Sequence, residues 1–181
     1  DTKINVIDSP GYFDFRSEMI SAVSVADLAI IVISATSGIE VGTNQAWDIC
    51  EKASIPRIIV VNKLDRENTN YVDIVNEIQS NWGRKCLPIQ TIDGNDSSFS
   101  KTISLISPDS DDVPDKWKEN FDESLAESDD SLIEKYLEGE ELLEDELKSA
   151  ISNSVGNSSI FPIVFCSAQN EIGVIDLLNI I

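Results

Sequence analysis

A short apolar run that ends abruptly in polar residues constrains the fold of this chain most strongly. Residues 58–61 read Ile-Ile-Val-Val and are followed directly by Asn62-Lys63-Leu64-Asp65. An unbroken run of β-branched residues is typical of a strand buried on both faces of a parallel sheet. In an open α/β sheet, ligands bind at the carboxyl ends of such strands. The pattern therefore predicts a buried strand with a candidate binding loop at its end.

The residues of that loop suit a guanine base. The Asp65 carboxylate is able to accept paired hydrogen bonds from N1–H and the exocyclic amino group of guanine, a pair that adenine does not present. Asn62 is placed to face another edge of the base, and the methylenes of Lys63 to cover its plane. A simpler interpretation, a strand that ends in a polar turn without a ligand, also fits these four residues taken alone.

Strand and helix patterns alternate through the first part of the chain and return at its end. We predict strands at residues 3–8, 28–33, 58–61 and 161–165, and helices at 14–25, 43–53, 70–82 and from 173 onward. Asp14 and Thr43 are the predicted caps of the first two helices. Such alternation is the pattern of a doubly wound parallel sheet with helices on both faces.

The alternation breaks after Gly83. Residues 87–92 and 99–106 are predicted to form two paired strands, followed by a helix with Trp117, Phe121 and Leu125 on one side. The last helix predicted in this inserted region carries an apolar stripe: Leu142, Leu143, Leu147, Ile151 and Val155. We expect that stripe to pack in a local core, with the charges opposite it facing solvent unless a basic partner is present. The predicted division is a sheet domain at 1–85 and 157–181, with an acidic α+β insertion at 86–156.

Composition excludes several classes of function. The formal net charge of -20, concentrated in residues 109–148, argues against unaided, sequence-specific binding of nucleic acid, because phosphates would be repelled. No apolar run approaches the roughly 20 residues of a membrane span. The three cysteines show no C-x-x-C spacing and histidine is absent, which argues against a zinc site and fits a reducing cytoplasm.

Three loops that follow strands carry a resemblance when they are taken together. Residues 8–15 read D-S-P-G-Y-F-D-F, residues 62–66 read N-K-L-D-R, and Ser167-Ala168 follows the last strand. They resemble D-T-P-G-H-V-D-F, N-K-x-D-R and the base-contacting loop of the translational GTPases. Residues 135–142, K-Y-L-E-G-E-E-L, are similar to a segment in the insertion of elongation factor G and its nearest kin. The chain thus looks like the GTP-binding domain of an elongation-factor-G-like protein, with a P-loop GTPase-type sheet.

The resemblance implies a role for each matching residue, with GTP or GDP and Mg²⁺ as the bound groups. Asp8 would hold a water on Mg²⁺, and the Gly11 amide would contact the γ-phosphate. Gly11 and the following residue, Tyr12, are the candidate catalytic residues. The Ala168 N–H would donate to guanine O6, with Ser167 supporting its loop. The complete set of implied nucleotide-binding residues is Asp8, Ser9, Pro10, Gly11, Asn62, Lys63, Asp65, Ser167 and Ala168.

Two departures from the family pattern affect the expected activity. Tyr12 stands where the family usually has a histidine that orients the attacking water, and a phenol is a poor proton acceptor at neutral pH. An aromatic side chain that packs on the following helix is the alternative interpretation of Tyr12. No G-x-x-x-x-G-K-[ST] motif is present, so we expect a chain that begins midway through the domain, after the first strand and phosphate loop. The strands that flank the missing one should gap, mispair or expose their edges, and this chain alone should bind GTP weakly and not hydrolyse it.

The acidic insertion is the expected partner surface. In the family it faces the stalk protein of the ribosome, and the glutamates implied here are Glu138, Glu140, Glu141, Glu144 and Glu146. Three functions remain open from the sequence. They are an elongation-factor-G-like GTPase, a ribosome-protection GTPase with the same domain, and a non-hydrolysing switch or stalk-binding module, for which Tyr12 is the motivating residue.

Overall fold

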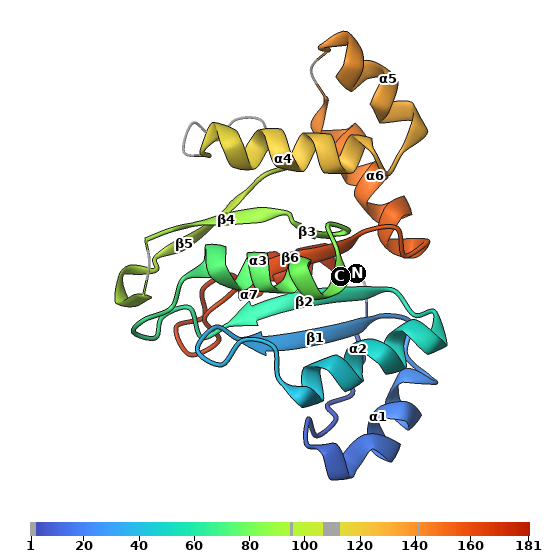
Figure 1. Ribbon diagram of the computed structural model, residues 1–181, viewed down its shortest axis with the longest axis vertical. Coiled ribbons are helices and arrows are strands. Elements are labelled where there is room, and N and C mark those ends of the chain that lie inside the picture. Colours follow the sequence, from blue (N-terminus) through green and yellow to red (C-terminus); the bar gives the residue numbers. More distant parts are fainter. Residues whose placement is uncertain (1–2, 95, 107–112, 141) are drawn as a thin grey trace.

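A four-stranded parallel sheet forms the centre of the molecule. The computed structural model describes residues 3–94, 96–106, 113–140 and 142–181 (Figure 1). Its central strands are β1 (Ala29–Ser34), β2 (Arg57–Asn62), β6 (Phe161–Phe165) and β3 (Cys86–Pro88), in the order β1-β2-β6-β3. The register places Ser34 beside Asn62 and Val61 beside Phe165. The carboxyl ends of β1, β2 and β6 therefore lie along one edge, as the predicted parallel sheet requires.

Helices cover both faces of this sheet, which confirms the predicted fold class. On one face, Ile59, Val61 and Phe165 pack in a core with side chains of α2 (Val41–Ala53) and α3 (Tyr71–Trp82). On the other face, alternate residues of the same strands pack with α4 (Asp115–Ala126) and α6 (Glu144–Gly156). Two shorter helices are α5 (Asp130–Glu138) and α7 (Val174–Ile180). Figure 1 shows α4, α5 and α6 grouped beyond β3, far from β1.

The helix starts differ from two of the predicted caps. The first helix opens with a 3₁₀ turn, η1 (Phe13–Phe15), which runs into α1 (Arg16–Val23), so Asp14 lies inside the turn and does not cap. Helix α2 begins at Val41, and Thr43 is its third residue. The Thr43 hydroxyl oxygen accepts the Glu40 backbone N–H at 3.2 Å. Thr43 therefore bonds the residue at the start of the helix from its third position and is not itself the N-cap residue.

The predicted strand at 87–92 is divided between two sheets. Its first part is β3, and its second part is β4 (Gln90–Asp93), which pairs antiparallel with β5 (Lys101–Ser104). Ile89 joins the two, because its N–H donates to the Ile163 carbonyl of β6 while its own carbonyl accepts the Leu105 N–H. One apolar run can therefore serve both sheets. The predicted division at residue 86 stays a prediction, and β3 belongs to the central sheet.

The predicted strand at 3–8 is wrong. Residues 3–11 have no regular secondary structure, and Val6 is 85% exposed. Among the described residues, β1 pairs only with β2, so its other edge has no strand beside it. Ile30 and Val32, which face one side of β1, remain 41% and 58% exposed. Alternating apolar residues form a strand only where a neighbour accepts their backbone hydrogen bonds. A gap, a mispairing or an exposed edge was expected beside the missing strand, and the structure shows the exposed edge of β1.

None of the helices in the described part of the chain combines the length and the apolar character that crossing a bilayer requires.

Candidate functional site

Asn62 joins two loops that lie far apart in the sequence. Its Oδ1 accepts the Lys63 backbone N–H at 2.7 Å and the Ala168 backbone N–H at 3.0 Å, across 106 residues of chain. Because both partners are N–H groups, the atom that faces them must be the amide oxygen. Lys63 adopts a φ of 67°, which turns the chain sharply away from β2. The residues predicted to read guanine are thus gathered at the carboxyl edge of the sheet.

The loop after β6 is a closed turn. Ser167 and Ile172 exchange two backbone hydrogen bonds of 3.0 and 3.1 Å, and the fully buried Ser167 accepts the Asn170 N–H on its Oγ at 3.2 Å. These bonds leave Ala168 and the two residues after it exposed at the tip of the loop. Burial, together with the charge of Asp65, raises the pKa of the preceding Cys166 thiol to about 11, so the thiol is uncharged at neutral pH.

Gly173 ends this loop and was missed by the sequence reasoning. Its φ is 75°, and a Cβ placed on it would lie 2.3 Å from the Phe165 carbonyl oxygen. A left-handed backbone in such close contact accepts only glycine without strain. The positive φ shows in the sequence only as a glycine before a helix, a pattern with many other causes.

Asp65 and Arg66 complete the first loop. The Asp65 side chain is 13% exposed, and its Oδ2 lies 3.8 Å from Arg66 Nε. Arg66 Nη2 donates to Gln169 Oε1 at 3.0 Å, which adds a second side-chain bond between the two loops. In the sequence Arg66 stands out only as part of a motif, and Gln169 does not stand out at all.

Thr69 anchors the backbone behind Asp65 and is a further residue that sequence reasoning missed. Its buried hydroxyl donates to the carbonyls of Leu64 and Arg66, at 3.1 and 2.9 Å, in a shared arrangement. Its backbone N–H donates to Asp96 Oδ1 at 2.6 Å. Leu64 itself is 1% exposed. The backbone of the loop after β2 is therefore anchored against the interior of the protein, while the Lys63 side chain is exposed to solvent.

The segment 8–12 is not hydrogen-bonded to this cluster among the described residues. Asp8, Pro10, Gly11 and Tyr12 are exposed, and no hydrogen bond described for them reaches the loops after β2 and β6. Tyr12 is 80% exposed, so its side chain does not pack closely on the following helix as the alternative interpretation required. Gly11 does have a defined neighbour, because a Cβ on Gly42 at the start of α2 would lie 2.5 Å from the Gly11 carbonyl oxygen.

A magnesium ion fits this segment only as a metal shared with a nucleotide. Asp8 offers one exposed carboxylate, and among the described residues no group of three or more His, Cys, Asp or Glu side chains is arranged to hold a metal. Mg²⁺ is commonly bound through one or two carboxylates, waters and substrate phosphates. The donor set of the described chain agrees with that mode, in which phosphates supply the remaining oxygens.

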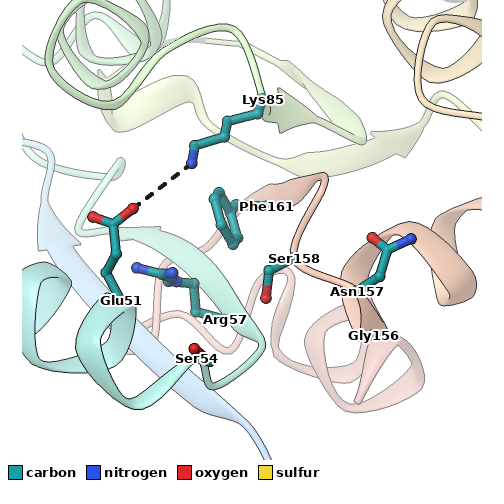
Figure 2. A pocket seen from close by; sticks show the side chains of 8 residues that line it. All are labelled: Glu51, Ser54, Arg57, Lys85, Gly156, Asn157, Ser158 and Phe161. Atoms are coloured by element: carbon teal, nitrogen blue, oxygen red, sulfur yellow. Dashed lines mark ion pairs between the residues drawn. The ribbon is translucent and has the colours of Figure 1, made fainter.

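A separate cavity of about 260 Å³ lies at the opposite edge of the sheet (Figure 2). Arg57 and Phe161, the first residues of β2 and β6, line it with Lys85 and Glu51. The Arg57 carbon Cζ lies 4.3 and 4.4 Å from the ring centres of Trp47 and Phe161, and Nη1 donates to the Trp47 carbonyl at 3.2 Å. Its buried Nε has no hydrogen-bond partner among the described atoms, and the aromatic faces stabilise this cation instead.

The charges around this cavity are balanced by the chain itself. Lys85 Nζ lies 4.0 Å from Glu51 Oε1, and Figure 2 shows the two side chains facing each other beside Phe161. Ser54 and Asn157, the residues that follow the last turns of α2 and α6, also line the cavity. The carboxyl ends of helices favour cations. The two cations therefore have local partners, and the cavity does not need an anionic ligand to explain them.

Comparison with known proteins identifies the group to which this site belongs. The family model described as the elongation factor Tu GTP binding domain matches residues 1–181. The chain belongs to this family. Its structure is similar to a crystal structure of a protein from Thermus thermophilus, with a TM-score of 0.83, 31% sequence identity and coverage of 95% of this chain. The chain spans 28% of the length of that solved chain. The predicted recognition of a GTP-binding domain from this group of translational GTPases is confirmed, whereas the functions of the individual site residues stay predictions.

Proposed function

We propose that the chain is the guanine-nucleotide-binding part of a ribosome-associated translational GTPase of the elongation factor G type, which couples GTP hydrolysis to a conformational step in elongation. The observation that carries the proposal is the hydrogen bond from Ala168 N to Asn62 Oδ1, which gathers both candidate base-reading loops at one edge of the sheet. In open α/β sheets that edge is the ligand-binding edge. The family match supports the same class of ligand.

Each loop has a defined task toward guanine in this proposal. The Asp65 carboxylate accepts from N1–H and the exocyclic amino group, and the Lys63 methylenes cover the base. The Ala168 N–H donates to O6, which must replace Asn62 Oδ1 as the acceptor of that N–H. The exchange substitutes one carbonyl-type acceptor for another, so its cost in free energy is small. Adenine has an amino group at position 6 and cannot make this exchange.

The segment 8–12 would supply the hydrolytic half of the site. Asp8 would hold a water on Mg²⁺, the Gly11 amide would contact the γ-phosphate, and the metal would neutralise charge on the phosphates when bound. Ser9 and Pro10 join these two residues. Because the segment is exposed and makes few contacts, GTP contacts could order it and GDP release it. Tyr12 is the candidate for orienting the attacking water.

The acidic insertion is the proposed ribosomal contact. Glu138 and Glu140 are exposed and have no ion pair among the described residues, whereas Glu144 and Glu146 pair with Lys148 and Lys135. The hydrogen bond from Lys135, with a further one from a backbone N–H, lowers the pKa of Glu146. The remaining predicted residue, Glu141, lies outside the described residues. We propose that the unpaired acids steer the domain toward a basic surface of the ribosomal stalk protein in the cytoplasm.

Ribosome-stimulated GTP hydrolysis by the full-length protein tests this function. We expect ribosomes to raise turnover, and the double variant Glu138→Lys, Glu140→Lys to reduce that stimulation by about 3- to 10-fold at low salt, because surface charges mainly change association rates. Added salt should narrow the difference between the two proteins. The control variant carries the same change in charge elsewhere: lysine replaces Glu123, on α4, and Glu127, just after that helix.

The outcomes separate the rival functions. GTP binding without turnover, with or without ribosomes, would indicate a non-hydrolysing switch. Turnover that ribosomes stimulate, with equal stimulation in the charge-reversed protein, would retain the GTPase and remove the stalk proposal. A ribosome-protection GTPase shares these properties, and displacement of a ribosome-bound antibiotic by the full-length protein would favour it over an elongation factor.

A further inference from the structure

Few bonds tie the two base-reading loops together beyond the strands that precede them. The backbone contact between Leu64 N and the Cys166 carbonyl is 3.5 Å long, at the limit of a hydrogen bond. Two side-chain bonds complete the connection among the described residues. Asn62 supplies one, and the other joins Arg66 Nη2 to Gln169 Oε1 at 3.0 Å across 103 residues of chain. The Asn62 bond must open when guanine O6 binds Ala168, which leaves the Arg66–Gln169 bond as the tie that persists.

Arg66 is placed to act on both loops at once. Its Nε lies 3.8 Å from Asp65 Oδ2, while its Nη2 holds Gln169, the residue next to Ala168. Its backbone is fixed by a turn bond from its N–H to the Lys63 carbonyl at 3.1 Å and by the Thr69 hydroxyl on its own carbonyl. The guanidinium is a planar fork with several donors, so it can engage two acceptors in a fixed relation, which a lysine ammonium cannot do with the same geometry.

We propose that Arg66 is a positioning residue for guanine specificity, because its guanidinium donates a hydrogen bond to Gln169 and lies within ion-pair range of Asp65, a clasp that links the two groups that read the base. The proposal rests on the proposed function of the site. The side chain of Arg66 is 58% exposed, and an exposed pair of this kind adds little to stability. Its contribution therefore lies in orientation. The carboxylate must present both oxygens to guanine while the Ala168 N–H meets O6, and a clasp between these groups restricts their relative motion.

Nucleotide affinities of the full-length protein test the clasp. GDP and inosine diphosphate differ only in the exocyclic amino group that Asp65 should bind, so the ratio of their Kd values reports the orientation of that carboxylate. We expect Arg66→Ala to raise the Kd for GDP by about 3- to 10-fold, the loss of roughly one hydrogen bond, and to raise that for inosine diphosphate less. Arg66→Lys should restore only part of the loss, because lysine lacks the fork.

A second variant and a charge control complete the design. Gln169→Ala breaks the tie between the loops and keeps the charge, and it should weaken GDP binding in a way that does not add to the effect of Arg66→Ala. Arg84→Ala removes another exposed cation at a distant position, and it should leave the ratio of the two affinities unchanged. This control accounts for the general effect of charge on binding an anionic nucleotide.

The outcomes distinguish the clasp from the site it serves. A narrowed GDP-to-inosine diphosphate ratio in Arg66→Ala, with non-additive loss in the double variant, supports the clasp. Equal effects of Arg66→Ala and Arg84→Ala, or additive effects of the Arg66 and Gln169 changes, would overturn it while the guanine site stands. Failure of the native protein to prefer GDP over adenosine diphosphate would overturn the proposed function and the clasp with it.

Discussion

Replacement of Asp65 by asparagine is expected to turn a protein that prefers GDP into one that prefers xanthosine diphosphate. The side-chain oxygen that accepts from the guanine amino group becomes an NH₂ donor, and xanthine presents a carbonyl oxygen at that position. Asp65 is suited to this substitution because its side chain is only 13% exposed and the residue before it, Leu64, is buried and anchors the loop. Sites that recognise a ligand through hydrogen bonds discriminate strongly against a ligand that leaves those bonds unmade, so we expect the preference to change by about 100-fold or more.

Competitive titration of the full-length protein with both diphosphates measures this change. Asp48→Asn, on the exposed side of α2, is the matched control, because it makes the same chemical substitution away from the loops. It should leave the GDP preference intact. Retention of a GDP preference in the Asp65 variant would mean that another group reads the amino group of guanine.

Replacement of Gly173 by alanine is expected to destabilise the protein by about 2 to 4 kcal/mol, through backbone strain and a steric clash together. The φ of 75° disfavours alanine, and the new methyl would lie 2.3 Å from the Phe165 carbonyl oxygen at the end of β6. To relieve the contact, the loop that carries Ser167 and Ala168 must move away from the sheet. GDP affinity should therefore fall along with stability.

Gly139→Ala separates the clash from the strain. Gly139 has nearly the same φ, 74°, but a methyl there would meet no atom within 4 Å. We expect this control to cost about 1 to 2 kcal/mol, the usual penalty for a left-handed non-glycine residue. Urea denaturation of the two variants gives both values. Equal losses of stability would show that the close approach of Gly173 to β6 adds nothing.

Much of the fold was predictable because its signals are local. The apolar runs of β2 and β6 and the helical spacing of apolar residues in α3 need no knowledge of the neighbours. The errors arose where a neighbour decides the outcome. Residues 3–8 alternate like a strand, but no described strand accepts their hydrogen bonds. Residues 87–92 read as one strand, and Ile89 in fact divides its hydrogen bonds between two sheets.

The candidate site shows the same limit. Asn62 and Asp65 stand out in the sequence because polar residues follow a buried strand, and Ala168 is named only through the family resemblance; the functions of all three toward guanine stay predictions. The supporting residues were not, because their roles depend on contacts across the fold. Gln169 accepts a hydrogen bond from Arg66, and Gly173 lies close against the Phe165 carbonyl oxygen at the end of β6. Likewise, nothing in the sequence indicated that Asn62 Oδ1 would bond the very N–H proposed to read O6.

The most direct test of the guanine site is calorimetric titration of the full-length native protein with GDP and with adenosine diphosphate. The two ligands share every phosphate and sugar contact and differ only in the base that the loops after β2 and β6 should read. We expect GDP to bind more tightly by about 100-fold or more, because adenine would leave Asp65 and the Ala168 N–H without partners. Equal affinities for the two diphosphates, or binding of neither, would contradict it.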